Sequence, residues 1–415
     1  MSERSDGATV ARPVRTPKRQ VHHRIKKLII DDSLTAEAVV SYMMDAQPTG
    51  DYYTEGGSAV VMWLATERAR TYFALGPEVG ARVSRHAMAS LLRGRHPVTG
   101  SKIRKAGQDE GKAVMVGGID VTINPAPKSV SVLWSVADDE LRRTIEREVY
   151  LSATRAITRM FDEVPMVRER YGPRPGDVRH VLAQDWVGVQ AIHTTARLTA
   201  HKGIPDPQLH VHNVLIGALD YKGQLRALDT LPMTRYHREM DAEATSALAE
   251  TFRQMGFPIR RIVERKKTGA IKTVKWELEG IPDELVKAMS ARTREIEDLK
   301  KQYEKHTGRE ADGPGWERFV EQQRGPKAKL SPTTMAAAWH EETAEYGYTP
   351  DVHAEYVRSA EEAAKAGVEE RGRTGWAADQ LRREILEELC REHAIVPRAE
   401  LDRLLVQLST GLMDP

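Results

Sequence analysis

The chain has 415 residues, which is room for one large domain and a second, smaller one. Hydrophobic residues make up 40% and charged residues 29%, so we expect a soluble protein with a sizeable core. No apolar run approaches the ~18 residues of a membrane span, which argues against membrane insertion. The single cysteine, Cys390, excludes an internal disulfide and any multi-cysteine metal site, and it fits a cytoplasmic protein.

The net charge of +2 conceals local basic clusters near residues 1–30 and 260–275. Local basic patches on a near-neutral chain are typical of nucleic-acid enzymes, although a disordered tail and a solvated hairpin are the alternatives. We predict that residues 1–23 form a basic, flexible N-terminal arm.

Hydrophobic periodicity predicts a mixed α and β region first and a mostly helical region after it. The predicted strands are 24–30, 114–124, 178–182, 186–193 and 209–219. The predicted helices in the first region are 35–44, 79–93, 138–163 and 235–255. A basic β-hairpin is expected over 259–278, with Thr268-Gly269 at its tip. Charged helices are expected over 282–310 and 331–347, and two more over 375–411.

The strongest chemical signal is a pair of histidines on the predicted strand 209–219. His210 and His212 lie two residues apart, so their side chains point to the same face, about 7 Å apart. Two imidazoles hold a divalent ion weakly, so a third ligand is needed, with positions left open for substrate oxygen. His193 ends the preceding apolar strand and is the preferred third ligand, and His201 in a polar loop remains the alternative. Two strand histidines with no metal are the simpler interpretation of the pair alone.

One carboxylate and three tyrosines complete the candidate site. Asp120 lies on strand 114–124, where it can fix the tautomer of a ligand histidine or help to deprotonate a tyrosine. Tyr42 lies on the first predicted helix, and Tyr52 and Tyr53 follow a turn. A phenol with its ordinary pKa of ~10 is a poor nucleophile, but a metal and a nearby base can activate it toward phosphorus. Aromatic core residues are the simpler alternative.

An ordered series of motifs resembles the MobF-class conjugative relaxases, which belong to the HUH endonucleases. Members carry a first-helix tyrosine and a Tyr-Tyr pair, here Tyr42 and Tyr52-Tyr53. The other matching segments are Leu91–Gly94 with Gly100, Asp120–Thr122, Ala126–Ser131, His193–Arg197 with Ala196 in place of a usual serine, and Asp206–His212. The resemblance covers roughly residues 35–350.

The resemblance implies a role for each candidate residue. Tyr42 would be the nucleophile, and Tyr52 and Tyr53 would be candidates for a second transfer. Asp120 would be the carboxylate beside the nucleophile and the metal. The implied metal triad consists of His193, His210 and His212, and the implied metal is Mg²⁺ or Mn²⁺.

The same resemblance implies a fold and a function. We expect an α+β relaxase domain over 24–350, built on an antiparallel β-sheet with flanking helices. A helical C-terminal segment over 351–415 follows and is compatible with the start of a further domain. The implied reaction is a metal-dependent, site- and strand-specific nick at an origin of transfer that leaves a 5′-phosphotyrosine adduct. The implied partners are DNA, accessory relaxosome proteins and a coupling protein.

Two other functions remain open at this point. A rolling-circle replication initiator would use the same chemistry at a replication origin. A non-catalytic DNA-binding protein would use the metal site for structure alone.

The sequence departs from the family in three places. Met43 stands where many members have a second tyrosine beside the first, so a two-tyrosine mechanism would need Tyr52 or Tyr53. The loop between His193 and His210 is longer than usual. A basic arm precedes the nucleophile, which in members usually lies very near the N-terminus.

Several basic and aromatic side chains are candidates for contacts with DNA. Arg197 is placed to pair with a phosphate, and Trp63 and Trp276 are candidates for stacking on a base, although a core position is the simpler role for both tryptophans. The remaining basic candidates are Lys102, Arg104, Lys105, Lys266 and Lys267.

Overall fold

The structure of the chain is a computed structural model. It describes residues 25–366, together with 405, 406 and 408, except for 33, 45–60, 77–80, 106, 110–111, 175, 200–201, 266–268, 270, 312, 324 and 326–329. The predicted arm over 1–23 and most of the two helices predicted over 375–411 therefore lie outside the described residues. So do five candidate site residues, namely Tyr52, Tyr53, His201, Lys266 and Lys267.

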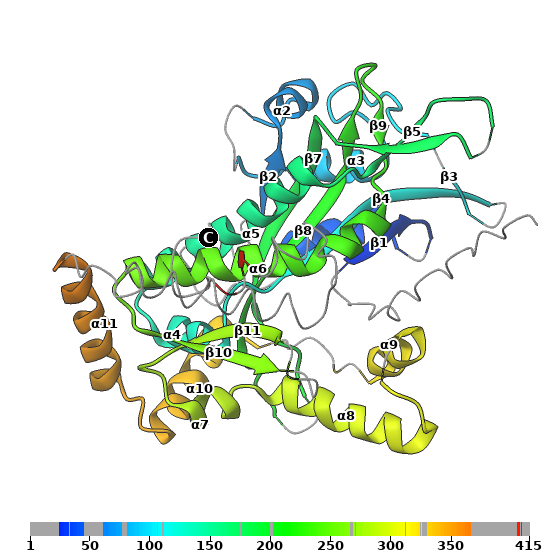
Figure 1. Ribbon diagram of the computed structural model, residues 1–415. Coiled ribbons are helices and arrows are strands. Elements are labelled where there is room, and N and C mark those ends of the chain that lie inside the picture. The colour runs from blue at the N-terminus through cyan, green and yellow to red at the C-terminus, as the bar shows by residue number, and fades with distance from the viewer. Residues whose placement is uncertain are drawn as a thin grey trace, which may run out of the picture.

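An antiparallel sheet forms the centre of the molecule (Figure 1). Its main path runs in the order β1-β4-β8-β7-β2. Two short strands lie off this path, where β3 (Gly107–Asp109) pairs with β4 and β9 (Leu225–Arg226) pairs with β8. The five main strands are β1 (Ile25–Ile30), β4 (Lys112–Ile123), β8 (Pro207–Leu219), β7 (Trp186–Thr195) and β2 (Val61–Ala65). The prediction of an α+β fold with an antiparallel sheet is confirmed.

Helices cover both faces of this sheet, and side-chain alternation along the strands supplies two separate cores. On one face, Val189 of β7 and Val214 of β8 pack with α1 (Ala36–Met44), α2 (Glu67–Phe73) and α3 (Arg85–Leu92). On the other face, Val121 of β4 and Val211 of β8 pack with the three helices that follow β4 and β9. These helices are α4 (Lys128–Val136), α5 (Asp139–Glu163) and α6 (Thr230–Gln254).

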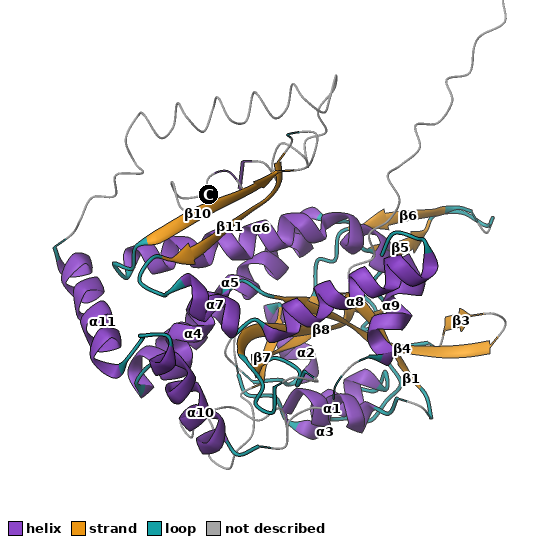
Figure 2. Ribbon diagram, turned by 90° about the horizontal axis from the view of Figure 1, so that it is seen from below, coloured by secondary structure: helices purple, strands orange, loops and turns teal. Residues whose placement is uncertain are grey.

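The part of the chain beyond α6 begins with a hairpin and then becomes helical (Figure 2). The hairpin consists of β10 (Ile259–Arg265) and β11 (Ile271–Leu278). The helices are α7 (Asp283–Ala288), α8 (Ala291–Thr307), α9 (Gly313–Gln322), α10 (Pro332–Glu345) and α11 (Pro350–Lys365). A helical region after the sheet is therefore confirmed. No described helix is both long enough and apolar enough to cross a membrane.

Several elements differ from the sequence predictions. The predicted strand 178–182 forms a separate hairpin, in which β5 (Val167–Arg170) pairs with β6 (Val178–Val181). The prediction did not include α4, because Pro125 and Pro127 mark a break in the chain. Pro127 is instead the residue that precedes the first turn of α4, a position that needs no backbone N–H. The elements β2, α2, α9 and α11 were also not predicted.

Candidate metal centre and nucleophile

Three histidines converge from two neighbouring central strands. His193 of β7 pairs with His210 of β8, and His212 lies two residues further along β8. Among the described residues, these three form a group whose ligating nitrogens all lie within 4.8 Å of one another. Nitrogen ligands ~2.1 Å from one cation lie roughly 3 Å apart in a facial arrangement, so small side-chain rotations suffice. The donor set therefore fits one divalent cation.

Strand β4 places a carboxylate behind His212. Both carboxylate oxygens of Asp120 lie 3.0–3.1 Å from Nδ1 of His212, and the Thr122 hydroxyl oxygen lies 3.3 Å from the same nitrogen. Because a carboxylate accepts hydrogen bonds, Nδ1 of His212 carries the hydrogen. The imidazole lone pair is then on Nε2, which is the atom that faces Tyr42.

The backbone fixes the second imidazole in the same way. Nδ1 of His210 lies 3.1 Å from the carbonyl oxygen of Gln208, which can only accept. Nδ1 of His210 is therefore the donor, and the lone pair of this ring is also on Nε2. His193 and His212 are buried, whereas His210 is partly exposed.

The first helix brings one tyrosine to the three histidines. The Tyr42 hydroxyl lies 3.1 Å from Nε2 of His212, and the Tyr42 ring lies edge-on to His193 and His212, with ring centroids 5.3 and 5.2 Å away. The next residue, Met43, is fully buried in the core on the α1 side of the sheet. Met43 therefore contributes to packing.

The basic residues predicted to contact DNA fall in different environments. Lys102 and Lys105 are exposed and Arg197 is partly buried. Arg104 is only 3% exposed, and its guanidinium donates to the backbone carbonyls of Val116, Gly117 and Ile216. Burial lowers the pKa of Arg104 to about 10. This position contradicts the prediction that Arg104 contacts DNA.

The two tryptophans considered for base stacking are core residues. Trp63 and Trp276 are 2% and 1% exposed, so neither ring is presented to solvent. Trp276 also donates its indole N–H to the carbonyl of Thr245. The core interpretation of both residues therefore holds.

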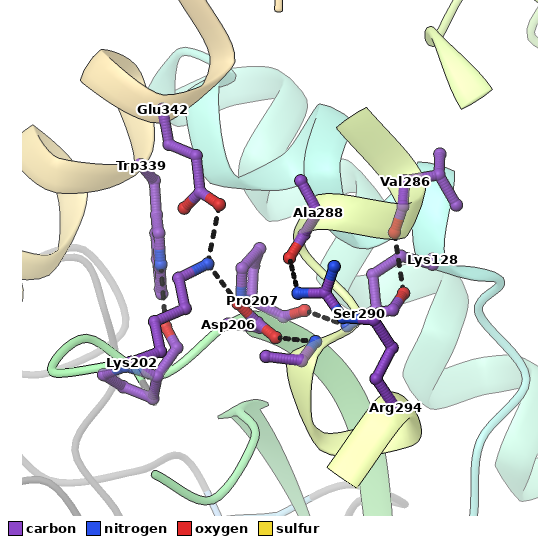
Figure 3. Close-up of polar contacts among 12 residues, drawn as sticks. Lys128, Lys202, Asp206, Pro207, Val286, Ala288, Ser290, Arg294, Trp339 and Glu342 are labelled. Atoms are coloured by element: carbon purple, nitrogen blue, oxygen red, sulfur yellow. Dashed lines mark hydrogen bonds and ion pairs between the residues drawn. The ribbon is translucent and has the colours of Figure 1, made fainter. Parts of the chain in front are cut away.

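A polar network not expected from the sequence holds the connection between β7 and β8 (Figure 3). Lys202 bridges the carboxylates of Asp206 and Glu342, with distances from Nζ of 2.5 and 2.7 Å. The second oxygen of Asp206 accepts the backbone N–H of Ala291, at the start of α8. Glu342 and Ala291 lie 140 and 85 residues from their partners, so no local sequence signal identifies them.

The family model of the TrwC relaxase matches residues 36–346 of the chain. The chain belongs to the TrwC relaxase family. The resemblance read from the ordered motifs is thus confirmed, and the protein is a DNA-nicking conjugative relaxase. A comparison of the relaxase with curated protein sequences finds no match.

Solved structures similar to this relaxase include several of the conjugative relaxase TrwC. A metal-bound complex of TrwC with oriT DNA has a TM-score of 0.58 and 20% sequence identity, covering 78% of this chain and 98% of that chain. A copper-bound complex with oriT DNA has a TM-score of 0.56 and 22% identity, with the same coverage. TrwC bound to a 27-mer DNA with the recognition hairpin and the cleavage site has a TM-score of 0.56 and 19% identity, again with the same coverage. These similarities show that the fold is shared.

Proposed function

We propose that this relaxase nicks one DNA strand at an origin of transfer, with Tyr42 as the nucleophile. His193, His210 and His212 hold one divalent cation beside it. The observation that carries the proposal is the 3.1 Å contact between the Tyr42 hydroxyl and Nε2 of His212, a nitrogen of the triad. Nucleophile and cation ligands thus meet at one point of the fold.

The chain's own residues account for the positioning that the reaction needs. A bond forms between the Tyr42 oxygen and the scissile phosphorus, and the bond from phosphorus to the 3′ oxygen breaks, so the 5′ end stays on the protein. The phenol proton leaves Tyr42, and the departing 3′ oxygen takes up a proton. Asp120 keeps His212 in the tautomer with its lone pair on Nε2. A bound cation would polarise the phosphate and stabilise the charge that develops on it.

The working cation in this proposal is Mg²⁺ or Mn²⁺. Three neutral imidazoles also suit zinc, nickel and copper, so affinity alone does not identify the ion that supports the reaction. Two similar TrwC structures are metal-bound, with copper in one case, which supports a metal at this site. Nicking assays with each ion in turn would identify the ion that supports activity.

The proposed DNA contacts involve three of the basic residues described above. Lys102 and Lys105 are exposed and would neutralise backbone phosphates, and Arg197 follows the His193 strand. The complexes of TrwC with oriT DNA support an origin of transfer as the target. Accessory relaxosome proteins, a coupling protein and a cytoplasmic location complete the proposal.

The test is an assay for a covalent adduct between protein and DNA. Labelled single strands that tile the transfer region of the element encoding the gene are incubated with Mn²⁺ or with EDTA. We expect an SDS-stable adduct with Mn²⁺, no adduct with EDTA, and at least ~10-fold less adduct in His210→Ala. His86→Ala is the control, because His86 is an exposed histidine on α3. Adduct formation that survives both EDTA and His210→Ala would exclude the metal role, and no adduct with any strand would favour non-catalytic DNA binding.

A further inference from the structure

Strand β8 extends beyond the end of its neighbour β4. The pairing between them runs from Leu215 opposite Ile119 to Val211 opposite Ile123, where β4 ends. Pro125, which follows shortly after, has no N–H and cannot continue a ladder. The first residues of β8, from Pro207 to His210, therefore extend past β4, and His210 is a proposed metal ligand.

Two side chains of α4 contact this edge of β8. Nζ of Lys128 donates to the carbonyl oxygen of Pro207 at 2.8 Å (Figure 3), and the Ser131 hydroxyl oxygen accepts the N–H of Leu209 at 3.1 Å. Both contacts are made by backbone groups beyond Val211, the last residue of β8 that pairs with β4. Side chains of α4 thus provide hydrogen-bond partners for the backbone of β8 beyond the end of β4.

The register of the other neighbour shows why this stretch needs support. His193 of β7 pairs with His210, and Thr195 pairs with Pro207, so two steps along β7 correspond to three along β8. The extra residue makes a β-bulge at Gln208 and Leu209, which disrupts the regular ladder with β7. A bulge beside a proposed metal ligand leaves its orientation dependent on other contacts.

We infer that Ser131 is a positioning residue for His210, acting through the single peptide group between Gln208 and Leu209. The N–H of this group donates to Ser131, and its carbonyl accepts from Nδ1 of His210. Because a peptide group is planar, holding its N–H fixes the direction of its carbonyl, and that carbonyl fixes the imidazole. Hydrogen bonds in such a chain also strengthen one another. The inference rests on the proposed function, since it takes His210 to be a metal ligand.

The same helix provides a matched control. Ser129 is 0% exposed and Ser131 is 1% exposed, so both hydroxyls are buried on α4. The Ser129 hydroxyl accepts the N–H of Leu278 in β11 at 2.8 Å, so it supports the hairpin and not β8. Replacing either serine with alanine removes one buried acceptor for one strand N–H. Only Ser131→Ala removes the acceptor for the peptide group that hydrogen-bonds to His210.

The experiment measures Mn²⁺ affinity of the full chain by calorimetry and amide exchange by mass spectrometry. Because partners of metal ligands are typically worth 10- to 100-fold in affinity, we expect Ser131→Ala to raise the Kd for Mn²⁺ about 10-fold, while Ser129→Ala changes it less than about 2-fold. Amide exchange at Leu209 should accelerate only in Ser131→Ala. Equal Kd values for all three proteins would overturn the inference. An equal loss in both variants would also overturn it, because it would indicate general destabilisation.

Two further outcomes separate this inference from the function on which it rests. The proposed function would be defeated if the wild-type chain did not bind Mn²⁺, or if His210→Ala bound Mn²⁺ as tightly as the wild type. Either result would hold whatever the serine variants do. If Ser131→Ala does not fold, Ser131→Cys replaces it, because a thiol has similar size but accepts hydrogen bonds weakly. Ser131→Cys should then give a Kd between the wild-type and 10-fold values, and an unchanged Kd with faster exchange at Leu209 would refute the role of Ser131.

Discussion

At the scale of single residues, hydrogen bonds decide which nitrogen each histidine offers to a cation. Asp120 holds Nδ1 of His212, and the Gln208 carbonyl holds Nδ1 of His210. Both rings therefore have their lone pairs on Nε2. The tyrosine hydroxyl contacts one of these Nε2 atoms, so the orientation of His212 also governs the position of the nucleophile.

The role of Asp120 can be tested by two substitutions. Asp120→Ala removes the acceptor for His212, so we expect Mn²⁺ affinity to fall between about 10- and 100-fold. Asp120→Asn keeps an acceptor oxygen but loses the charge, and its loss should be smaller. Asp32→Asn, an exposed aspartate after β1, serves as the control. Titration with Mn²⁺ measures the effect, and wild-type affinity in Asp120→Ala would rule out this role.

At the scale of elements, Arg104 donates hydrogen bonds to backbone carbonyls at the points where the pairing of two adjacent strands is irregular. Register shifts occur at Gly117 in β4, against β1, and at Ile216 in β8, against β7. Bulges interrupt the ladder at such points, and the carbonyls of Gly117 and Ile216 both accept from Arg104. The guanidinium is thus a structural donor that links the two strands next to the site.

The exposed Lys105, next to Arg104 in the chain, provides a control for the structural role of Arg104. Arg104→Met leaves buried carbonyls without their donor, and we expect it to lower the free energy of unfolding by about 3 kcal/mol. Lys105→Met should leave that free energy nearly unchanged. It should instead lower the slope of log K for DNA binding against log salt concentration by about one, because one phosphate contact is lost. Denaturant unfolding and salt titrations of DNA binding measure the two effects. An Arg104→Met protein as stable as wild type would contradict the structural role.

The same elements show what the sequence could and could not predict. The strands that carry His193, His210 and His212 were predictable because apolar composition and a two-residue spacing are local signals. The role of Arg104 was not, because its acceptors lie 12, 13 and 112 residues away, and two of them, Gly117 and Ile216, lie at register shifts that no local pattern indicates. The sequence of basic residues from Lys102 to Lys105 is the same whether Arg104 is buried or exposed, so it does not reveal the burial of Arg104.

At the scale of the whole molecule, the packing of α11 bears on where the relaxase domain ends. Ala360 is 2% exposed and belongs to the main core, and the Tyr356 ring packs on Phe257, with ring centroids 5.4 Å apart. Gly256, with φ of +82°, lies directly under the backbone of α11 at Ala360. We propose that the domain predicted to end at residue 350 extends through Lys365.

Truncation tests this domain limit. A chain that ends at residue 349 loses the contacts of α11, and we expect it to be less stable by roughly 2 kcal/mol or more than a chain that ends at 366. Gly256→Ala in the longer chain should have a similar effect, because a Cβ would collide with α11 and left-handed backbone disfavours alanine. Thermal unfolding measures both. Equal stability of the two truncated chains would place α11 outside the domain.

The fold brings together residues that are far apart in the chain, since Tyr42 and His212 are separated by 170 positions. The most direct test of this convergence is to digest the covalent adduct and identify by mass spectrometry the residue that carries the nucleotide. We predict a 5′-phosphate linked to Tyr42 after reaction with Mn²⁺. A nucleotide on Tyr52 or Tyr53 in place of Tyr42, or a cut strand with no attached peptide, would contradict the account.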